Sequence, residues 1–357
     1  MNKIHNYSAG PCILPQEVFK KASDSILNFG NTDLSLIEIS HRSNDFIEVM
    51  EQARALVIDL LEVPKGYTVL FLQGGASLGF LTTAYNMMKE HKAGGYLVTG
   101  AWAKKAAKEA DFVGKKIVLA SSEDANFNYI PKDYSIPENI DYIHLTSNNT
   151  IFGTQIKDFP KSDIPLVCDM SSDIFSKKIN VSSFDLIYAG AQKNMGPAGT
   201  TLYIVKDEIL GNSSVSIPTM LDLKTHADKD SMFNTPPVFA IYTSMLTLQW
   251  LKENGGLNWI EKRNNSKADL IYNEIERNSL FNGTANKDDR SHMNATFTLT
   301  KETIKDQFDS MLINANISGL KGHRSVGGYR ASMYNALPLE SVQVLVDVMK
   351  ELEVKFG

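Results

Sequence analysis

The stretch YAGAQKNMGPAGTTLYI, residues 188–204, places one lysine, Lys193, between two apolar runs and next to a turn rich in glycine and proline. The apolar start is typical of a strand, and the residues that follow Lys193 are typical of a tight turn. One interpretation of Lys193 is a solvated turn lysine, since the chain has 36 Lys and Arg residues. The other is a lysine that must lose its proton to form an imine. That chemistry requires a desolvated pocket, because burial disfavours the ammonium form.

Outward from this stretch, apolar strand-like segments alternate with helix-like segments over the first two-thirds of the chain. Helices are expected at residues 15–29, 44–63, 77–90 and 101–114. Strands are expected at residues 67–73, 94–100, 115–121, 141–147, 164–170, 185–192 and 200–206. Short apolar strands that alternate with helices predict an α/β fold with a mostly parallel sheet flanked by helices.

The pattern changes after Asn234, where long helices are expected at residues 236–256 and 258–278. Strands at 294–300 and 329–335 and helices at 301–317 and 339–356 follow. We therefore predict a smaller α+β domain at residues 256–357 and a large cofactor-binding domain at residues 16–255. Residues 1–15 are expected to form an N-terminal segment that packs near the active site. Asn44 and Thr235 are candidate helix caps, the latter for a helix that starts at Pro236.

Composition limits the class of protein. The chain has 357 residues, 43% hydrophobic residues and a net charge of −5, which argues against nucleic acid or a membrane surface as partner. The N-terminus lacks the apolar region of a signal peptide, so a cytoplasmic location is expected. Cys168 lies in an apolar run far from Cys12, which favours a buried thiol over a disulfide. We expect no metal site, because no Cys or His cluster has metal-ligand spacing.

Ligands of open parallel sheets bind at the carboxyl ends of the strands. After residues 67–72 comes Gln73-Gly74-Gly75-Ala76-Ser77, which opens a helix. Such a loop is often only a tight turn, but its backbone N–H groups and the helix dipole also suit an anion. Neither the G-x-G-x-x-G dinucleotide motif nor a Gly-Lys-Ser/Thr nucleotide loop occurs in the chain.

Further candidates follow other strands. Trp102 stands at a strand-to-helix corner, where it either belongs to the core or covers a flat ring. Asn148-Asn149-Thr150 offers polar groups to a ring substituent. Asp169 ends a buried strand and either meets a helix N-terminus or pairs with a protonated ring nitrogen. Asp173 is the weaker candidate because the strand has ended before it.

Together these residues supply the parts that a pyridoxal 5'-phosphate (PLP) enzyme needs. The Gly-Gly loop suits the phosphate, Asp169 the pyridinium proton and Lys193 the Schiff base. The order of these groups on successive strand ends is the strongest feature of the pattern.

Six motifs extend from residue 7 to residue 336: YSAGPCILP, EISHRS, LQGGASLGF, AGAQKNMGPAGTT, NTPPVFAIY and GHRSVGGYRASMYNA. They resemble the phosphoserine aminotransferases, a family of the class V aminotransferases within the fold-type I PLP enzymes. The resemblance implies a homodimer with active sites at its interface. Some members carry Gly-Arg where this chain has Ala76-Ser77. The phosphate cup of this chain would therefore have one positive charge fewer than theirs. Some also have serine at the position of Ala9, so we assign Ala9 no polar role.

The resemblance also implies roles for individual residues. Lys193 would form the Schiff base with PLP, and Asp169 would pair with the nitrogen of the PLP ring. Trp102 would stack on this ring, and Thr150 would bond the side of the ring that carries the phenolic oxygen. The phosphate would be held by Ala76, Ser77 and Gln192, and by Asn234 and Thr235 of the neighbouring subunit.

Basic groups predict the substrate. Arginine bonds carboxylates and phosphates in a bidentate manner, and the motifs contain His41-Arg42, His323-Arg324 and Arg330. By resemblance Arg330 would bind the α-carboxylate. Arg42 of the partner subunit, with His323 and Arg324, would bind the distal anion. His41 is a further candidate for substrate binding.

Together with these groups, the resemblance implies transfer of the amino group between glutamate and 3-phosphohydroxypyruvate, giving 2-oxoglutarate and phosphoserine. The sequence leaves open whether a longer phosphorylated 2-oxo acid of pyridoxine biosynthesis is also used. The alternatives are a class V lyase, which would need a mobile cysteine, and a nucleotide-binding module without chemistry, which would leave Lys193 and Asp169 unexplained.

Overall fold

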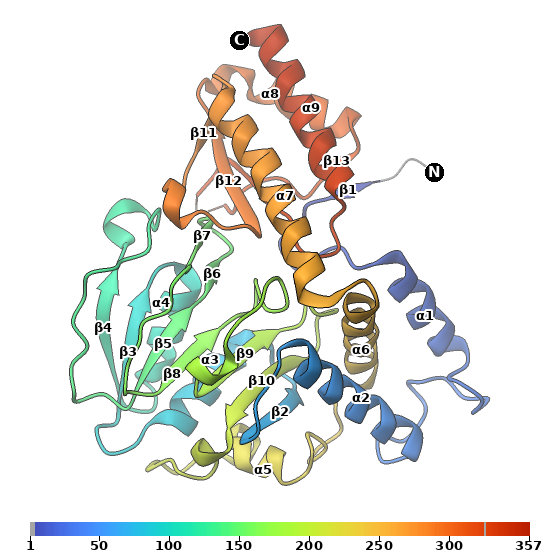
Figure 1. Cartoon of the computed structure of the whole chain (residues 1–357), viewed down its shortest axis with the longest axis vertical. Helices are drawn as coiled ribbons and strands as arrows, with labels where there is room; N and C mark the ends of the chain where they lie inside the picture. Colours follow the sequence, from blue (N-terminus) through green and yellow to red (C-terminus); the bar gives the residue numbers. More distant parts are fainter. Residues whose placement is uncertain (1–3, 325) are drawn as a thin grey trace.

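The computed structural model describes residues 4–324 and 326–357 (Figure 1). Residues 1–3 of the expected N-terminal segment and Ser325 of the last motif therefore lie outside the described residues. The α-helices are α1 (Gln16–Leu27), α2 (Asn44–Leu60), α3 (Gly75–Met87), α4 (Ala101–Ala110), α5 (Leu223–Ala227), α6 (Val238–Glu253), α7 (Gly256–Arg277), α8 (Lys305–Asn314) and α9 (Leu339–Phe356).

Within the described residues, the central sheet has seven strands in the order β2-β10-β9-β8-β5-β3-β4. Their bounds are β2 (Tyr67–Leu72), β3 (Ala93–Val98), β4 (Lys115–Ser121), β5 (Tyr142–Thr146), β8 (Leu166–Asp169), β9 (Leu186–Gly190) and β10 (Thr201–Lys206). Strands β9, β8, β5, β3 and β4 pair in parallel, which confirms the predicted mostly parallel sheet. Strand β10 runs antiparallel to β9 and β2, because only residues 191–200 connect it to β9 and no crossover helix intervenes.

Side chains alternate between the two faces of this sheet and explain its apolar strands. On β9, Ile187 packs into a core shared with α1, α2 and α6, whereas Tyr188 packs into a core shared with α3 and α4. Strand β10 divides in the same way, with Ile204 on the first face and Tyr203 on the second. Both faces are therefore covered by helices, as expected for strands that are apolar at nearly every position.

A third core lies in the narrower part of the molecule, at the top of Figure 1. It joins α7, α8 and α9 to an antiparallel sheet of order β11-β12-β14, made of β11 (Phe281–Gly283), β12 (Asn294–Leu299) and β14 (Tyr329–Ser332). Strand β1 (His5–Asn6) pairs in parallel with β13 (Ile317–Ser318), and Tyr7 is buried in the same core. A two-stranded ribbon, β6 (Asn148–Asn149) and β7 (Thr154–Gln155), follows β5.

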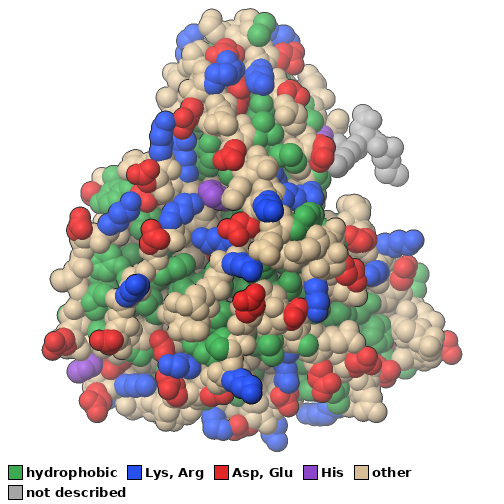
Figure 2. Space-filling model, in the orientation of Figure 1, with side chains coloured by type: hydrophobic (Ala, Val, Ile, Leu, Met, Phe, Trp, Pro, Cys, Tyr) green, Lys and Arg blue, Asp and Glu red, His purple; other side chains and the backbone are tan. Residues whose placement is uncertain are grey.

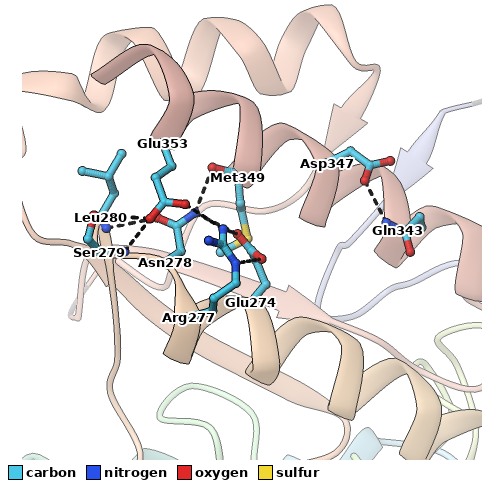
Figure 3. A network of polar contacts seen from close by, with 9 residues as sticks. All are labelled: Glu274, Arg277, Asn278, Ser279, Leu280, Gln343, Asp347, Met349 and Glu353. Atoms are coloured by element: carbon cyan, nitrogen blue, oxygen red, sulfur yellow. Dashed lines mark hydrogen bonds and ion pairs between the residues drawn. The ribbon is translucent and has the colours of Figure 1, made fainter. Parts of the chain in front are cut away.

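Helices α7 and α9 are joined by polar contacts as well as by apolar packing (Figure 3). Arg277 donates to Glu274 at 2.8 Å and to Glu353 at 2.7 Å, so one guanidinium connects the two helices. Asn278 donates to the backbone oxygen of Met349 at 3.0 Å. The end of α7 is thereby held against the last turns of α9.

Two predicted helix caps are wrong. Asn44 is the first residue of α2, and Ser43 occupies the cap position without a side-chain cap bond. Helix α6 begins at Val238, not at Pro236, because Pro237 disfavours the helical conformation of the residue before it. Thr235 is thus too far from α6 to cap it, and its backbone oxygen instead accepts a hydrogen bond from Gln73 at 2.7 Å.

Acidic and basic side chains are interspersed over the face of the molecule shown in Figure 2. None of the helices in the described part of the chain has the length and apolar character that crossing a bilayer would require.

Candidate active site

A cavity of about 310 Å³ lies at the carboxyl ends of the parallel strands. Its wall combines the start of α3, the start of α4, the ends of β5 and β8, and the turn between β9 and β10. The residues that line it are Ala9, Gly10, Gly75, Ala76, Ser77, Trp102, Thr146, Asn148, Thr150, Ile151, Asp169, Ser171, Ser172, Gln192, Lys193, His323 and Arg330. The cavity therefore brings together segments from residue 9 to residue 330.

Lys193 is buried in this wall, so the alternative of a solvated turn lysine does not apply. Its Nζ donates a hydrogen bond to Thr150 Oγ1 at 2.9 Å. Burial lowers the pKa of Lys193 to about 8, although the nearby Asp169 carboxylate favours the charged form; the positive charge of Arg330 lowers the pKa further. Burial thus raises the share of the neutral amine, which is the form that imine formation and proton abstraction require.

Asp169 is the last residue of β8 and is buried beside the cavity. Burial raises the pKa of its carboxyl group, while hydrogen bonds from Ser171 and the charge of Lys193 act in the opposite direction. Asp173 is also buried, but it accepts hydrogen bonds from Ser147 and from Gln155, the latter at 3.0 Å, and it is not among the cavity residues. Of the two acids, Asp169 is the one placed to meet a ligand.

The start of α3 forms the cup that the Gly-Gly loop predicts. Gly74 has a φ of 98°, and a Cβ atom there would lie 2.4 Å from the Leu78 side chain, so the turn requires glycine. No side chain caps α3, while Gly75, Ala76 and Ser77 line the cavity. The first N–H groups of the helix are therefore available to an anion in this part of the cavity.

Two buried donors of the cavity wall have no hydrogen-bond partner within the described residues. They are Nε1 of Trp102 and Nε of Arg330. The other end of the Arg330 guanidinium donates to the backbone oxygen of Thr150 at 3.4 Å. Because an unsatisfied buried donor costs free energy, this wall favours a ligand that brings acceptor atoms. PLP fits this cavity, whose wall combines an amine, a carboxylate, a flat aromatic ring and an anion cup.

The structure brings most of the predicted site residues together and leaves others outside the cavity wall. Inside are Ala76, Ser77, Trp102, Thr150, Asp169, Gln192, Lys193, His323 and Arg330. Within the described residues of this chain, the wall does not include His41, Arg42, Asn234, Thr235 or Arg324. Arg42, Thr235 and Arg324 are exposed, and Asn234 donates to the side chain of Gln73 at 3.2 Å.

Sequence reasoning missed several residues of the wall. Ser171 and Ser172 lie two and three residues after Asp169, so the rule that strand ends share one edge could have found them. Gly10 belongs to the N-terminal segment that was expected near the active site, but it follows no strand end that would single it out. Ala9 received no polar role, yet its backbone oxygen accepts a hydrogen bond from the Tyr334 hydroxyl at 2.8 Å.

Cys12 lies beside the cavity but does not have the environment of a nucleophile. Its Sγ donates to the backbone oxygen of Lys193 at 2.8 Å, and burial raises the pKa of the thiol to about 12. Both Cys12 and Cys168 are free thiols, and Cys168 is buried as predicted. Neither thiol lies on a mobile, exposed loop of the kind that a cysteine-dependent lyase uses.

Comparison with known proteins agrees with this geometry. A family model described as aminotransferase class-V matches residues 4–345. The phosphoserine aminotransferase of Flavobacterium psychrophilum is 65% identical over 354 residues, which are 99% of each chain. A solved phosphoserine aminotransferase from Bacillus circulans subsp. alkalophilus is 43% identical, with a TM-score of 0.96 and 99% of each chain covered. A PLP-bound phosphoserine aminotransferase from Trichomonas vaginalis is 34% identical, with a TM-score of 0.93, covering 98% of this chain and 100% of that chain.

Proposed function

The chain belongs to the class V aminotransferases, within the phosphoserine aminotransferase family, and from this premise we propose that it is a phosphoserine:2-oxoglutarate aminotransferase. It interconverts 3-phosphohydroxypyruvate and glutamate with phosphoserine and 2-oxoglutarate, a step of serine biosynthesis. The observation that carries the proposal is that one cavity holds the amine of Lys193, the carboxylate of Asp169 and the guanidinium of Arg330.

The enzyme uses PLP, which when bound supplies an electron sink for the α-carbon of an amino acid. The residues of the cavity fit this group, and each has a proposed role. Asp169 would pair with the ring nitrogen, since a buried carboxylate is stabilised by a cation. Trp102 would cover the ring and Thr150 would bond its phenolic oxygen side. The phosphate would be held by Ala76, Ser77 and Gln192.

Lys193 has two proposed tasks. Its Nζ would hold the cofactor covalently before the substrate arrives. Once released, the amine would take the proton from the substrate α-carbon and deliver it on the cofactor side of the same cavity. Its lowered pKa of about 8 supports this role, because a general base works best when its pKa lies near the working pH.

Two ends of the substrate would be recognised by different cations. Arg330 would bind the α-carboxylate, since its Nε is a buried donor without a partner among the described residues. His323 lines the same cavity, and with Arg324 it would bind the distal anion. The phosphate of phosphoserine and the γ-carboxylate of glutamate would share that subsite, so one pocket would serve both half-reactions. A longer phosphorylated 2-oxo acid of pyridoxine biosynthesis has the same two anionic ends and is a second candidate substrate.

We propose that the enzyme works as a cytoplasmic homodimer. His41 and Arg42 would join the distal-anion subsite of the partner subunit, and Asn234 and Thr235 would reach its cofactor phosphate. The position of these residues outside the wall of their own cavity supports this arrangement. Large apolar side chains near both segments are exposed, among them Ile37 at 59% and Phe233 at 39%, as expected of an interface.

A transamination assay tests the proposed function. Glutamate is the amino donor, and 3-phosphohydroxypyruvate is compared with hydroxypyruvate, which lacks the phosphate. We expect a kcat/KM at least about a hundredfold higher for the phosphorylated oxo acid. Hydroxypyruvate lacks the doubly charged phosphate and therefore cannot make the charged contacts of the distal-anion subsite. Equal values for the two oxo acids would refute the proposed substrate. A protein that stays colourless after addition of PLP would instead point to a binding module without this chemistry.

A further inference from the structure

Lys105 lies next to the cavity but is not explained by the proposed roles. It follows Trp102 by three residues on α4, a spacing that places two side chains on the same face of a helix. Its Nζ lies 4.3 Å from the centroid of the Trp102 ring. Trp102 lines the cavity and Lys105 is exposed, so the ammonium group lies over the ring of a wall residue and is open to solvent.

The charge of Lys105 is part of a larger positive cluster. Burial lowers the pKa of His323, and the positive charges of Arg330, Arg324 and Lys105 lower it further. The ammonium of Lys105 thus adds to the positive charge around a side chain of the cavity wall. Within the described part of the chain, no carboxylate forms an ion pair with Lys105, Arg324 or Arg330.

The adjacent lysine has a different environment. Lys104 forms an ion pair with Glu123 at 2.5 Å, so its charge is compensated by a residue that follows β4. Both lysines are exposed and lie on the same helix, yet only Lys105 contacts a residue of the cavity wall through its charged group. The pair thus provides a matched comparison within one turn.

We propose that Lys105 is a further specificity-determining residue, whose ammonium group at the Trp102 ring attracts the distal anion of the substrate into the cavity. The proposal rests on the proposed function and adds a residue of the same chain to the distal-anion subsite. Positive charges that lack carboxylate partners repel one another, and a bound anion removes that repulsion. A phosphate carries more negative charge than a carboxylate, so Lys105 favours phosphoserine over glutamate.

Single half-reactions of the holoenzyme test this assignment. The variants are Lys105→Gln, Lys105→Arg and the control Lys104→Gln, and the substrates are phosphoserine, glutamate and alanine. For Lys105→Gln we expect kcat/KM to fall about five- to tenfold with phosphoserine, about two- to threefold with glutamate and least with alanine. Lys105→Arg restores most of the phosphoserine rate, and Lys104→Gln matches the wild type.

A second measurement separates charge from packing. The His323 ring is titrated by NMR in the wild type and in both glutamine variants. Removal of a nearby positive charge favours the imidazolium, so Lys105→Gln raises the pKa of His323 and Lys104→Gln leaves it in place. A purely structural role of Lys105 predicts no such difference between the two variants.

The outcomes are distinct. Equal losses with alanine and phosphoserine in Lys105→Gln overturn the proposal, as does an equal effect of Lys104→Gln on phosphoserine or on the His323 titration. Wild-type behaviour of Lys105→Gln in both measurements also overturns it. A wild-type enzyme that does not discriminate phosphoserine from alanine refutes the proposed function instead, because the distal-anion subsite itself is then absent.

Discussion

Ser171 donates two hydrogen bonds to Asp169, from its hydroxyl at 2.6 Å and from its backbone N–H at 2.9 Å. Both bonds end on Oδ1, and the Ser171 hydroxyl also accepts a hydrogen bond from the backbone of Gly190 at 3.0 Å. Strand β9 thereby fixes the orientation of a carboxylate on the neighbouring strand β8. Asp169 thus meets the cavity with a fixed geometry, although burial opposes its ionisation.

The first prediction compares the two acids near this strand end. Asp169→Asn should lower kcat/KM by about a hundredfold or more, because a neutral amide cannot stabilise a cationic ring nitrogen. The decrease in kcat/KM caused by Asp173→Asn should be at least about tenfold smaller, since Asp173 contacts Ser147 and Gln155 and does not line the cavity. Steady-state kinetics of both variants measure the difference. Equal losses would mean that the wrong acid has been chosen.

The second prediction concerns the covalent link to the cofactor. Borohydride reduction of the holoenzyme, followed by digestion and peptide mass mapping, should place the pyridoxyl adduct on Lys193. Lys193→Ala should still bind PLP through the anion cup but lose turnover by about a thousandfold or more, because both the covalent link and the base are removed. An adduct on any other lysine would contradict the assignment of Lys193.

Much of this site could be predicted from the sequence because strand ends and short motifs are local features. Trp102, Asp169 and Lys193 each lie at or shortly after the end of an apolar strand, and parallel strands bring such positions to one edge of the sheet. The tight turn at Gly74 could be predicted from the residue type alone. For the same reason the sheet itself was predictable, since its strands are apolar on both faces.

Other features depend on contacts between distant segments, which no local pattern encodes. The hydrogen bond from Gln73 to the backbone of Thr235 spans 162 residues and replaces the predicted role of Thr235 as a helix cap. The packing of Ala9 and Gly10 into the cavity wall is equally non-local. Lys105 was not predicted because a lysine on an amphipathic helix is usually only solvated, and its position over Trp102 becomes visible only in three dimensions.

The third prediction concerns acid stability. His144 is fully buried, its Nε2 lies 2.8 Å from the Tyr188 hydroxyl, and burial lowers its pKa from 6.5 to about 3. Between these values the unfolded chain binds a proton that the folded chain does not, so stability falls as the pH falls from 6.5 toward 3. The loss amounts to about 2 kcal/mol at pH 5.0, at about 1.4 kcal/mol per pH unit.

His144→Gln removes this titration and can still hydrogen-bond Tyr188. Urea unfolding at pH 7.5 and pH 5.0 should therefore show a smaller loss of stability on acidification in the variant than in the wild type. The control is His91→Gln, which removes an exposed histidine and so measures the effect of losing a histidine that is not buried. The same decrease in His144→Gln and the wild type would show that other groups control acid unfolding.

The fourth prediction tests whether two chains build each site. Arg42→Ala and Lys193→Ala homodimers should both be nearly inactive. After mixing and subunit exchange, a heterodimer should regain one working site, in which wild-type Arg42 of one chain serves Lys193 of the other. Activity should approach about a quarter of the wild-type value when exchange is complete, since half of the dimers are mixed and each has one good site. No recovery after confirmed exchange would mean that each site lies within one chain.

The fifth prediction separates the two ends of the substrate. Arg330 lines the cavity and bonds the backbone of Thr150, whereas Arg324 is exposed and lies next to the cavity residue His323. Arg330→Ala should lower kcat/KM for every amino acid by about a hundredfold, because all of them carry the α-carboxylate. Arg324→Ala should penalise phosphoserine and glutamate much more than alanine, which has no distal anion.

Single half-reactions with phosphoserine, glutamate and alanine measure these losses without interference from the second substrate. The comparison within each variant matters more than its absolute rate, because a general defect in folding or cofactor binding lowers all three values together. A selective loss therefore reports the contact itself. If Arg324→Ala slows alanine as much as phosphoserine, the two arginines have been assigned to the wrong ends of the substrate.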